Sequence, residues 1–281
     1  MKLSFFEPYI ELRPFIHYIW VFESPVGMPP SDSNLAAPNG CSKLIINCEN
    51  SIISEVRGIL QHSKEHRVYF VGSRDIPVKL STPHKKTGFL GIEFYPHGAY
   101  PVFGIPMAET ANQLLNFDDL LGKLGREIND TVCSLNRVKN KIDLIQRQMI
   151  EILRQNQLKQ KHAISNNLLI NYCVNSLKST NGLMPISVLV NKTGYSKRYL
   201  EILFKNHIGF SPKVLAGIFR FQKFYKNWAQ GRPYSEIKNE LNEYYYDQAH
   251  YIKDFKKMTG FSPLSFSQNV SNEFGRRLSL Q

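Results

Sequence analysis

The sequence predicts an α+β N-terminal domain, with a small mostly antiparallel sheet followed by helices, and an all-α C-terminal domain with two helix-turn-helix units joined by a long helix. Three observations predict this fold class. Short apolar runs separated by turn residues fill the chain to about residue 95. From about Ala108 the apolar residues recur with helical spacing. The string FKNHIGFSP at Phe204 returns as FKKMTGFSP at Phe255, so one local structure is used twice.

Five apolar runs in the first part are typical of strands. Each combines β-branched and aromatic residues and is bounded by Pro, Gly, Asn or Ser. They are FIHYIWVF from Phe15, SKLIINC from Ser42, HRVYFVG from His66, IPVKLS from Ile76 and TGFLGIEF from Thr87. We expect them to pair as the antiparallel sheet.

An apolar seam marks the helical end of this domain. Leu135, Val138, Ile142, Ile145, Met149 and Ile152 follow one another at spacings of 3, 4, 3, 4 and 3 residues. The seam forms either a coiled-coil dimer or a helix packed on its own domain. It spans fewer than the three or four heptads typical of coiled coils, which favours the second interpretation. The polar stretch RQNQLKQKH follows from Arg154, and we predict a linker at 154–163.

Six helices are predicted after the linker, at 164–178, 186–191, 197–207, 213–228, 235–241 and 247–258. In the fourth, Val214, Ile218, Phe221, Tyr225 and Trp228 recur at spacings of 4, 3, 4 and 3, so one face is buried. About sixteen residues at 1.5 Å rise make this helix a spacer of roughly 24 Å.

The repeated string carries residues that end one helix and begin the next. Glycine follows helices because it takes positive φ without strain. A serine N-cap accepts a backbone N–H, and proline fits the first helical position. These residues are Gly209, Ser211 and Pro212 in the first copy and Gly260, Ser262 and Pro263 in the second.

A helical hairpin precedes each copy. The inward side chains are Leu200, Leu203 and Phe204 in the first hairpin and Ile237, Leu241, Tyr251 and Phe255 in the second. The outward side chains are Lys197, Arg198, Glu201 and Lys205 in the first and Gln248, Ala249, Lys253, Lys256 and Lys257 in the second. A mostly cationic face on the second helix of such a hairpin suits the phosphates and base edges of a DNA major groove. A solvated surface charge pattern is the alternative.

The basic charge lies in the C-terminal part. The formal charge of the chain is +12, and residues 160–281 hold 17 Lys and Arg against 7 Asp and Glu. A domain with such an excess is typical of proteins that bind polyanions such as nucleic acids. A basic face without a partner remains the alternative.

TGYSKRYLEILFKNHIGFSP, the 213–228 helix and YYDQAHYIKDFKKMTGFSP together resemble the DNA-binding domain of the AraC/XylS family of bacterial transcriptional regulators. The resemblance implies a DNA-binding domain at 164–268, followed by a C-terminal tail at 269–281. In that family the two second helices enter successive major grooves on one side of the duplex. The resemblance therefore implies a cytoplasmic, sequence-specific regulator, and an activator as the commoner behaviour. Its implied partners are double-stranded promoter DNA and RNA polymerase, and no cofactor is implied.

Carried over by position, the resemblance implies that bases are read by Arg198, Glu201 and Ile202 in the first unit and by Gln248, Ala249, Ile252 and Lys253 in the second. Ser196 and Lys197 are the implied phosphate contacts. The full predicted set is Ser196, Lys197, Arg198, Glu201, Ile202, Lys205, Asp247, Gln248, Ala249, Ile252, Lys253, Lys256 and Lys257.

The second unit departs from the family pattern at two places. Lys238 stands where a small residue packs between the helices, and Asn242 replaces the glycine of the turn. Two extra residues, one of them among Tyr244, Tyr245 and Tyr246, precede Asp247. These departures leave a second hypothesis open, a protein-interaction adaptor with a degenerate second unit and weak or no sequence-specific DNA binding.

The N-terminal part more distantly resembles a domain that precedes this module in a subset of the family, through ELRPFIHYIWVFES, AAPNGCSKLIINC and TGFLGIEFYPHGAY. The resemblance implies a sensing or dimerisation domain at 1–153, with a small-molecule effector or a second copy as its partner. Trp20, Phe22, Phe94 and Tyr95 either line an apolar pocket or, as we favour, belong mostly to the sheet core.

The sequence offers little for an enzyme, because no GxSxG, P-loop or HExxH motif occurs. His62 and His66 are expected in a loop rather than on one helix face, so no metal site is predicted. Cys41, Cys48, Cys133 and Cys173 lack metal-ligand spacing and are expected to be free thiols. No apolar run approaches the roughly 18 residues of a membrane helix, and Glu7, Pro8 and Glu11 interrupt the start where a signal peptide would be apolar.

Overall fold

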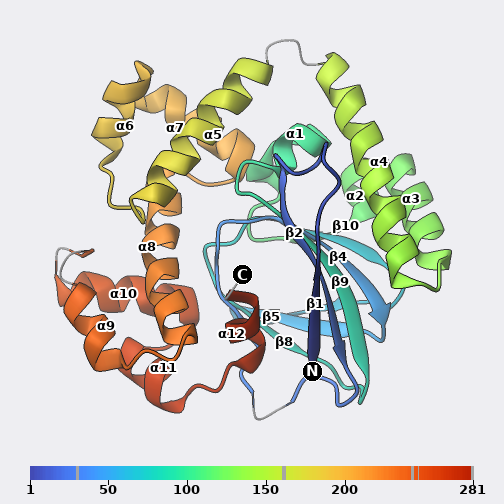
Figure 1. The fold of residues 1–281 in the computed structure, drawn as a ribbon, viewed down its shortest axis with the longest axis horizontal. Helices are drawn as coiled ribbons and strands as arrows, with labels where there is room; N and C mark the ends of the chain where they lie inside the picture. Colours follow the sequence, from blue (N-terminus) through green and yellow to red (C-terminus); the bar gives the residue numbers. More distant parts are fainter. Residues whose placement is uncertain (30–31, 160–162, 242–243, 246, 280–281) are drawn as a thin grey trace.

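The computed structural model describes residues 1–29, 32–159, 163–241, 244–245 and 247–279. Figure 1 shows two sheets with covering helices on one side and a helical part on the other. The larger sheet has the order β1-β2-β9-β4-β7-β10, the smaller the order β3-β8-β5-β6, and every pairing is antiparallel. The strands are β1 (Lys2–Phe6), β2 (Ile16–Ser24), β3 (Leu35–Ala36), β4 (Lys43–Glu49), β5 (Ile52–Val56), β6 (Ile59–Ser63), β7 (Val68–Val71), β8 (Val78–Ser81), β9 (Thr87–Phe94) and β10 (Leu114–Asn116).

The five predicted strands are confirmed as β2, β4, β7, β8 and β9, but they do not form one sheet, because β8 lies in the smaller sheet. The prediction missed the hairpin of β5 and β6, whose turn is Arg57 at φ 51° and Gly58 at φ 80°. Its strands mix apolar residues with Ser54, Gln61 and Ser63, and Ile59 and Leu60 are exposed. The smaller sheet exposes one face to solvent, so this hairpin lacks the continuous apolar runs by which the strands of the larger sheet were recognised.

The larger sheet separates two apolar layers, because successive side chains of a strand point to opposite faces. Ile19 and Val21 of β2 face a core closed by helices, while Trp20 and Phe22 face the smaller sheet. The covering segments are α1 (Ala99–Phe103), the 3₁₀ turn η1 (Met107–Glu109), α2 (Phe117–Leu121), α3 (Lys123–Ser134) and α4 (Val138–Lys159). Gly91 of β9 makes room for Trp20, since a Cβ there would lie 2.2 Å from the indole ring.

The apolar seam packs on its own domain, as favoured from the sequence. Ile142, Ile145, Met149 and Ile152 of α4 are buried in the helix-covered core, so the coiled-coil interpretation is wrong. Leu135 caps the C-terminus of α3 and does not belong to α4, the helix that contains the rest of the seam. Most of the predicted linker is helical, because α4 continues to Lys159, and residues 160–162 lie outside the described part of the chain.

All six helices predicted after the linker are confirmed. They are α5 (Ala163–Ser179), α6 (Ile186–Thr193), α7 (Lys197–Ile208), α8 (Pro212–Ala229), α9 (Tyr234–Leu241) and α10 (Gln248–Thr259), and α11 (Pro263–Asn269) and α12 (Glu273–Ser279) follow. The connector α8 is buried on two faces. Leu215, Ala216 and Phe219 belong to the core of the first unit, whereas Ile218 and Phe221 belong to that of the second.

The repeated string forms the predicted local structure in both copies. Gly209 and Gly260 end α7 and α10 with φ of 91° and 85°. The hydroxyls of Ser211 and Ser262 accept N–H groups from Val214 at 3.4 Å and from Ser265 at 3.3 Å, and a proline opens each following helix. The two units therefore end in equivalent caps.

Replacing Ser262 by alanine is expected to lower the free energy of unfolding by about 1 kcal/mol, because α11 loses the acceptor for one of its first N–H groups. Urea unfolding followed by circular dichroism measures this loss. Ser267→Ala serves as the matched control, since the Ser267 hydroxyl only donates to the Leu264 carbonyl inside the same helix. An equal loss for both variants would contradict the capping role.

Part of the segment assigned to a C-terminal tail forms α12 instead, which packs against the sheets, and residues 280–281 lie outside the described part of the chain. Phe274 is 2% exposed and lies among Trp20, Phe22 and Phe89, with its ring 5.4 Å from that of Phe22. The Asp32 carboxylate accepts from the backbone N–H groups of Glu273 and Phe274 at 2.9 and 3.3 Å. The sequence did not indicate this contact, because VSNEFGRRLSL holds few apolar residues and its burial depends on a distant surface.

Candidate functional site

The first candidate DNA-binding helix is α7. The Ser196 hydroxyl caps it by accepting the Tyr199 N–H at 3.2 Å. Leu200, Leu203 and Phe204 are buried as predicted. The opposite face carries the predicted contact residues, of which Ser196, Lys197, Arg198, Ile202 and Lys205 are exposed and Glu201 is half-buried. Ile202 is 51% exposed, so an apolar side chain stands in solvent among the charged ones.

The second candidate helix is α10. Asp247, predicted as a DNA contact, is its N-cap and accepts the His250 N–H at 2.7 Å. Tyr251 and Phe255 are buried as predicted. The predicted contact residues Asp247, Gln248, Ala249, Lys253, Lys256 and Lys257 are exposed, and Ile252 is half-buried. Both helices thus present their predicted polar faces on the surface.

The described residues of the second unit form a packed core despite the departure at Lys238. Lys238 is exposed, and its neighbour Ile237 fills the space between the helices, so no charged side chain is buried there. Tyr245 is buried with its ring 5.3 Å from that of Tyr251, and the Arg220 guanidinium lies 5.6 Å from the Tyr245 centroid. Tyr245 therefore packs under α10. Asn242 and Tyr246 lie outside the described residues.

One predicted contact residue bridges the two parts of the molecule. The Lys257 ammonium lies 2.6 Å from the Asp75 carboxylate, which also accepts from the Asn112 amide at 2.9 Å. Burial would raise the pKa of Asp75, but the hydrogen bonds from Lys257 and Asn112 outweigh it and lower the pKa. Lys257 must exchange this carboxylate for a phosphate before it can contact DNA.

The end of α7 packs on the N-terminal domain, a contact that the sequence did not indicate. His207 is 3% exposed, and its ring centroid lies 4.1 Å from that of Tyr100 in α1. Burial lowers the pKa of His207 to about 4, so the imidazole is neutral near pH 7. The Ser73 hydroxyl donates to the Ile208 carbonyl. The first unit is therefore held against the N-terminal domain by its own second helix.

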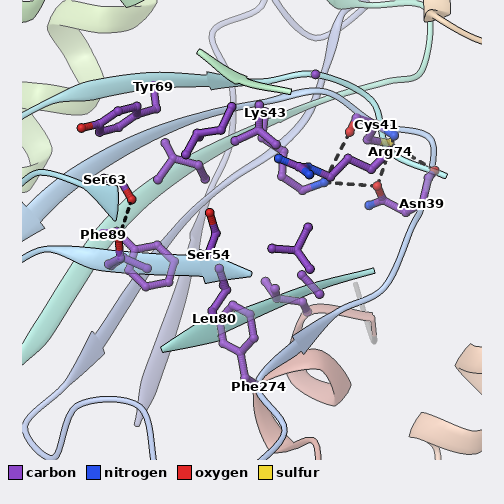
Figure 2. Close-up of a pocket in the computed structure, with 18 of the residues that line it drawn as sticks. Asn39, Cys41, Lys43, Ser54, Ser63, Tyr69, Arg74, Leu80, Phe89 and Phe274 are labelled. Carbon is purple, nitrogen blue, oxygen red and sulfur yellow. Dashed lines mark hydrogen bonds between the residues drawn. The ribbon is translucent and has the colours of Figure 1, made fainter. Parts of the chain in front are cut away.

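A cavity lies between the two sheets, and Figure 2 shows its walls. Trp20 lines it, as one interpretation of the sequence proposed. Phe22 packs on Phe274, Phe94 belongs to the helix-covered core, and Tyr95 lines a smaller hollow beside the C-terminal part, so most of the four are core residues. Phe274 and Leu278 of α12 close one side of the larger cavity.

The structure also places the histidines and cysteines that were considered as possible metal ligands. His62 lies in β6 and His66 in a turn at φ 50°, so they share no helix face. Among the described residues there is no group of three or more His, Cys, Asp and Glu side chains that could hold a metal ion. The four cysteines are free thiols. Within the described part of the chain, no helix is both long and apolar enough to cross a membrane.

Comparisons with known proteins give a limited result. Residues 4–116 match the family model described as a domain of unknown function, DUF6597, which is less than half of the chain. No curated protein matches the chain.

The solved structures similar to the chain include several of ToxT from Vibrio cholerae. A P21 crystal form is 9% identical, covers 90% of this chain and 98% of ToxT, and has a TM-score of 0.48. ToxT with a bound unsaturated fatty acid is 9% identical, covers 95% and 98%, and has a TM-score of 0.47. ToxT from strain O395 is 9% identical, covers 90% and 97%, and has a TM-score of 0.46. Similarity at this level carries no argument about function.

Proposed function

We propose that the chain is a sequence-specific DNA-binding regulator of transcription, in which α7 and α10 enter successive major grooves of one duplex. The observation that supports this most directly is the pair of equivalent hairpins, α6–α7 and α9–α10. Each second helix presents an exposed cationic face and ends in the same glycine and Ser-Pro cap. The resemblance of the same segments to the AraC/XylS family supports the proposal.

The two helices differ in what they can recognise. Arg198 can pair with the O6 and N7 atoms of guanine, and Glu201 can accept from cytosine N4. On α10, Ala249 and Ile252 offer apolar contact with a thymine methyl group, and Gln248 can pair with adenine. Lys253 faces the bases with them, and Lys205, Lys256 and, once it leaves Asp75, Lys257 supply phosphate contacts. We therefore assign base recognition to both units, and recognition by hydrogen bonds mainly to α7.

The remaining assignments complete the proposal. Residues 164–268 form the DNA-binding domain, and residues 1–153 sense a small molecule or bind a second copy. The protein acts without enzymatic activity in the bacterial cytoplasm as an activator that contacts RNA polymerase. No observation favours the adaptor hypothesis, because it assumes a degenerate second unit, whereas the described residues of that unit form a packed core.

Fluorescence anisotropy with the full chain tests the proposal. Duplexes enriched by selection and random duplexes of equal length are compared at 50 and 200 mM salt. We expect two half-sites one helical turn apart, binding about a thousandfold tighter than random DNA. We expect the affinity for both to fall steeply with salt, because several phosphate contacts release counterions.

Arg198→Ala is expected to weaken binding to the selected site roughly 10- to 100-fold and to relax the base preference at one position, because a bidentate base contact is lost. Lys139→Ala is the matched control, since this exposed lysine of α4 lies in the N-terminal domain and has the same charge. No DNA binding at 50 mM salt would overturn the proposal and leave the adaptor. Equal losses for the two variants would overturn the role of Arg198.

A further inference from the structure

The cavity between the sheets has a volume of about 110 Å³ and mainly apolar walls. The larger sheet contributes Trp20, Ile45 and Phe89, the smaller contributes Ile52 and Leu80, and α12 contributes Phe274. In Figure 2, Arg74, Lys43, Asn39 and Cys41 gather at one end, whereas Phe89, Leu80 and Phe274 lie toward the other. The cavity is therefore apolar with one polar end.

Arg74 brings a positive charge to that end without a negative partner. The residue is 8% exposed, and no ion pair of its guanidinium occurs among the described residues. Its Nη1 donates to the Asn112 carbonyl at a long 3.4 Å, and its Nε has no hydrogen-bond partner. Burial lowers the pKa of Arg74 to about 10, which leaves it charged near pH 7. A buried charge without a partner is costly in free energy.

The second cation of the cavity is already neutralised. The Lys43 ammonium lies 3.2 Å from the Glu93 carboxylate and also donates to the Asn39 side chain at 3.1 Å. Burial would raise the pKa of Glu93, but Lys43 and then His17 outweigh it and lower the pKa to about 2. Lys43 and Glu93 therefore cancel, and the cavity retains one positive charge, that of Arg74.

We propose that this cavity binds a compact organic monoanion, a carboxylate with a small hydrocarbon body, whose charge pairs with Arg74 and whose body lies between the two sheets. One unpaired guanidinium matches one carboxylate, and its planar fork suits the two oxygens. A phosphate monoester would bring nearly two charges and leave one unmatched. The apolar walls take the hydrocarbon part.

The size of the cavity limits the ligand. A closed apolar cavity of about 150 Å³ holds one benzene molecule. The present cavity is smaller, so the hydrocarbon body has fewer than six carbon atoms. A long-chain acid does not fit unless the sheets separate.

The ligand would also contact the C-terminal part. Phe274 and Leu278 line the cavity from α12, so a filled cavity adds contacts that hold this helix in place. The proposal of this ligand class rests on the sensing role proposed for residues 1–153. Its test uses no DNA, so a failure of ligand binding and a failure of DNA binding are separate results.

Isothermal titration calorimetry with the full chain at pH 7 tests the proposal, with hexanoate as the probe and hexan-1-ol as its uncharged counterpart. We expect hexanoate to bind at least tenfold tighter than hexan-1-ol, because a charge-assisted hydrogen bond is lost with the alcohol. We expect hexadecanoate to bind more weakly than hexanoate.

Arg74→Met should weaken hexanoate binding at least tenfold while leaving hexan-1-ol binding unchanged or tighter. The same variant should raise the melting temperature of the ligand-free protein, because an uncompensated buried charge is removed. Arg74→Lys keeps the charge and should retain a preference for hexanoate over the alcohol. Lys79→Met, an exposed lysine of β8, is the control and should change neither ligand.

Three results would overturn the proposal. These are equal binding of hexanoate and hexan-1-ol, unchanged hexanoate binding by the Arg74→Met protein, and no hexanoate binding at millimolar concentration. Tighter binding of hexadecanoate than of hexanoate would overturn the limit on ligand size.

Discussion

Replacing Asn272 by alanine is expected to lower the free energy of unfolding by roughly 3 to 5 kcal/mol, because the change leaves several buried polar groups without partners. The Asn272 side chain accepts from the Leu35 N–H at 2.9 Å and donates to the Leu35 carbonyl at 2.9 Å. It also donates to the Tyr225 hydroxyl at 2.8 Å. Asn272 is 1% exposed, and Leu35 and Tyr225 are buried as well, so water can replace these bonds only in part.

The contact also joins three elements. Leu35 belongs to β3, at the edge of the smaller sheet, and Tyr225 belongs to the connector α8. Urea unfolding monitored by circular dichroism should show the loss of stability. Limited proteolysis should show faster cleavage after Arg276 or Arg277, because α12 separates more often from β3. Asn269→Ala, which changes an exposed asparagine at the end of α11, should stay within about 0.5 kcal/mol of the parent. If Asn272→Ala and Asn269→Ala have the same free energy of unfolding, the hydrogen bonds between the Asn272 amide and Leu35 do not hold α12 in place.

Phe255→Ala is expected to lower the free energy of unfolding by about 3 to 5 kcal/mol, because it removes a large side chain from a closed aromatic cluster. Phe255 is 1% exposed, and its ring lies 4.8 Å from Phe224 and 5.5 Å from both Phe221 and Phe266. These rings come from α8 and α11, so one substitution loosens α10 from the connector and from the helix that follows it.

The Phe255 substitution should also uncouple the two helix-turn-helix units. The core of the first unit contains neither Phe255 nor its ring contacts, so α7 should keep its fold. We therefore expect a selected two-part DNA site to be bound through one half-site only, with the salt dependence reduced because fewer phosphates are contacted. Lys238→Ala, at an exposed lysine of α9 that is not among the predicted DNA contacts, keeps the Phe255 core and is the control. A Phe255→Ala protein with parental stability would show that the cluster does not seat α10.

The sequence allowed the C-terminal helices to be predicted because their signals are local. Glycine after α7 and α10, serine before α8 and α11, and the spacing of Leu200, Leu203 and Phe204 each depend on neighbours within one or two helical turns. The exposure of the predicted contact residues followed from the same spacing. The prediction that DNA is read by these residues remains to be tested by the binding measurements above.

The features that escaped prediction depend on distant partners. Phe274 looks like an isolated aromatic residue in a polar segment, and its burial requires Phe22 and Phe89. Lys257 carries the same charge as Lys253 and Lys256, and nothing nearby in the sequence indicates that Asp75 binds it. Arg74 precedes an aspartate, and only the fold shows that this aspartate binds a lysine and that no carboxylate of the described residues pairs with the guanidinium.

The hydrogen bonds between Leu35 and Asn272 join two segments that the ribosome synthesises at different times. Asn272 is synthesised 237 residues after Leu35, which at about 5 to 20 residues per second is roughly 10 to 50 seconds later. Once β8 and β9 have been synthesised, β3 forms the edge of the smaller sheet without its later partner, and the aromatic face that receives Phe274 stays uncovered until α12 is made. Edges and faces of this kind recruit other chains. A nascent chain is therefore prone to aggregate until α12 has left the ribosome and covers this edge and face.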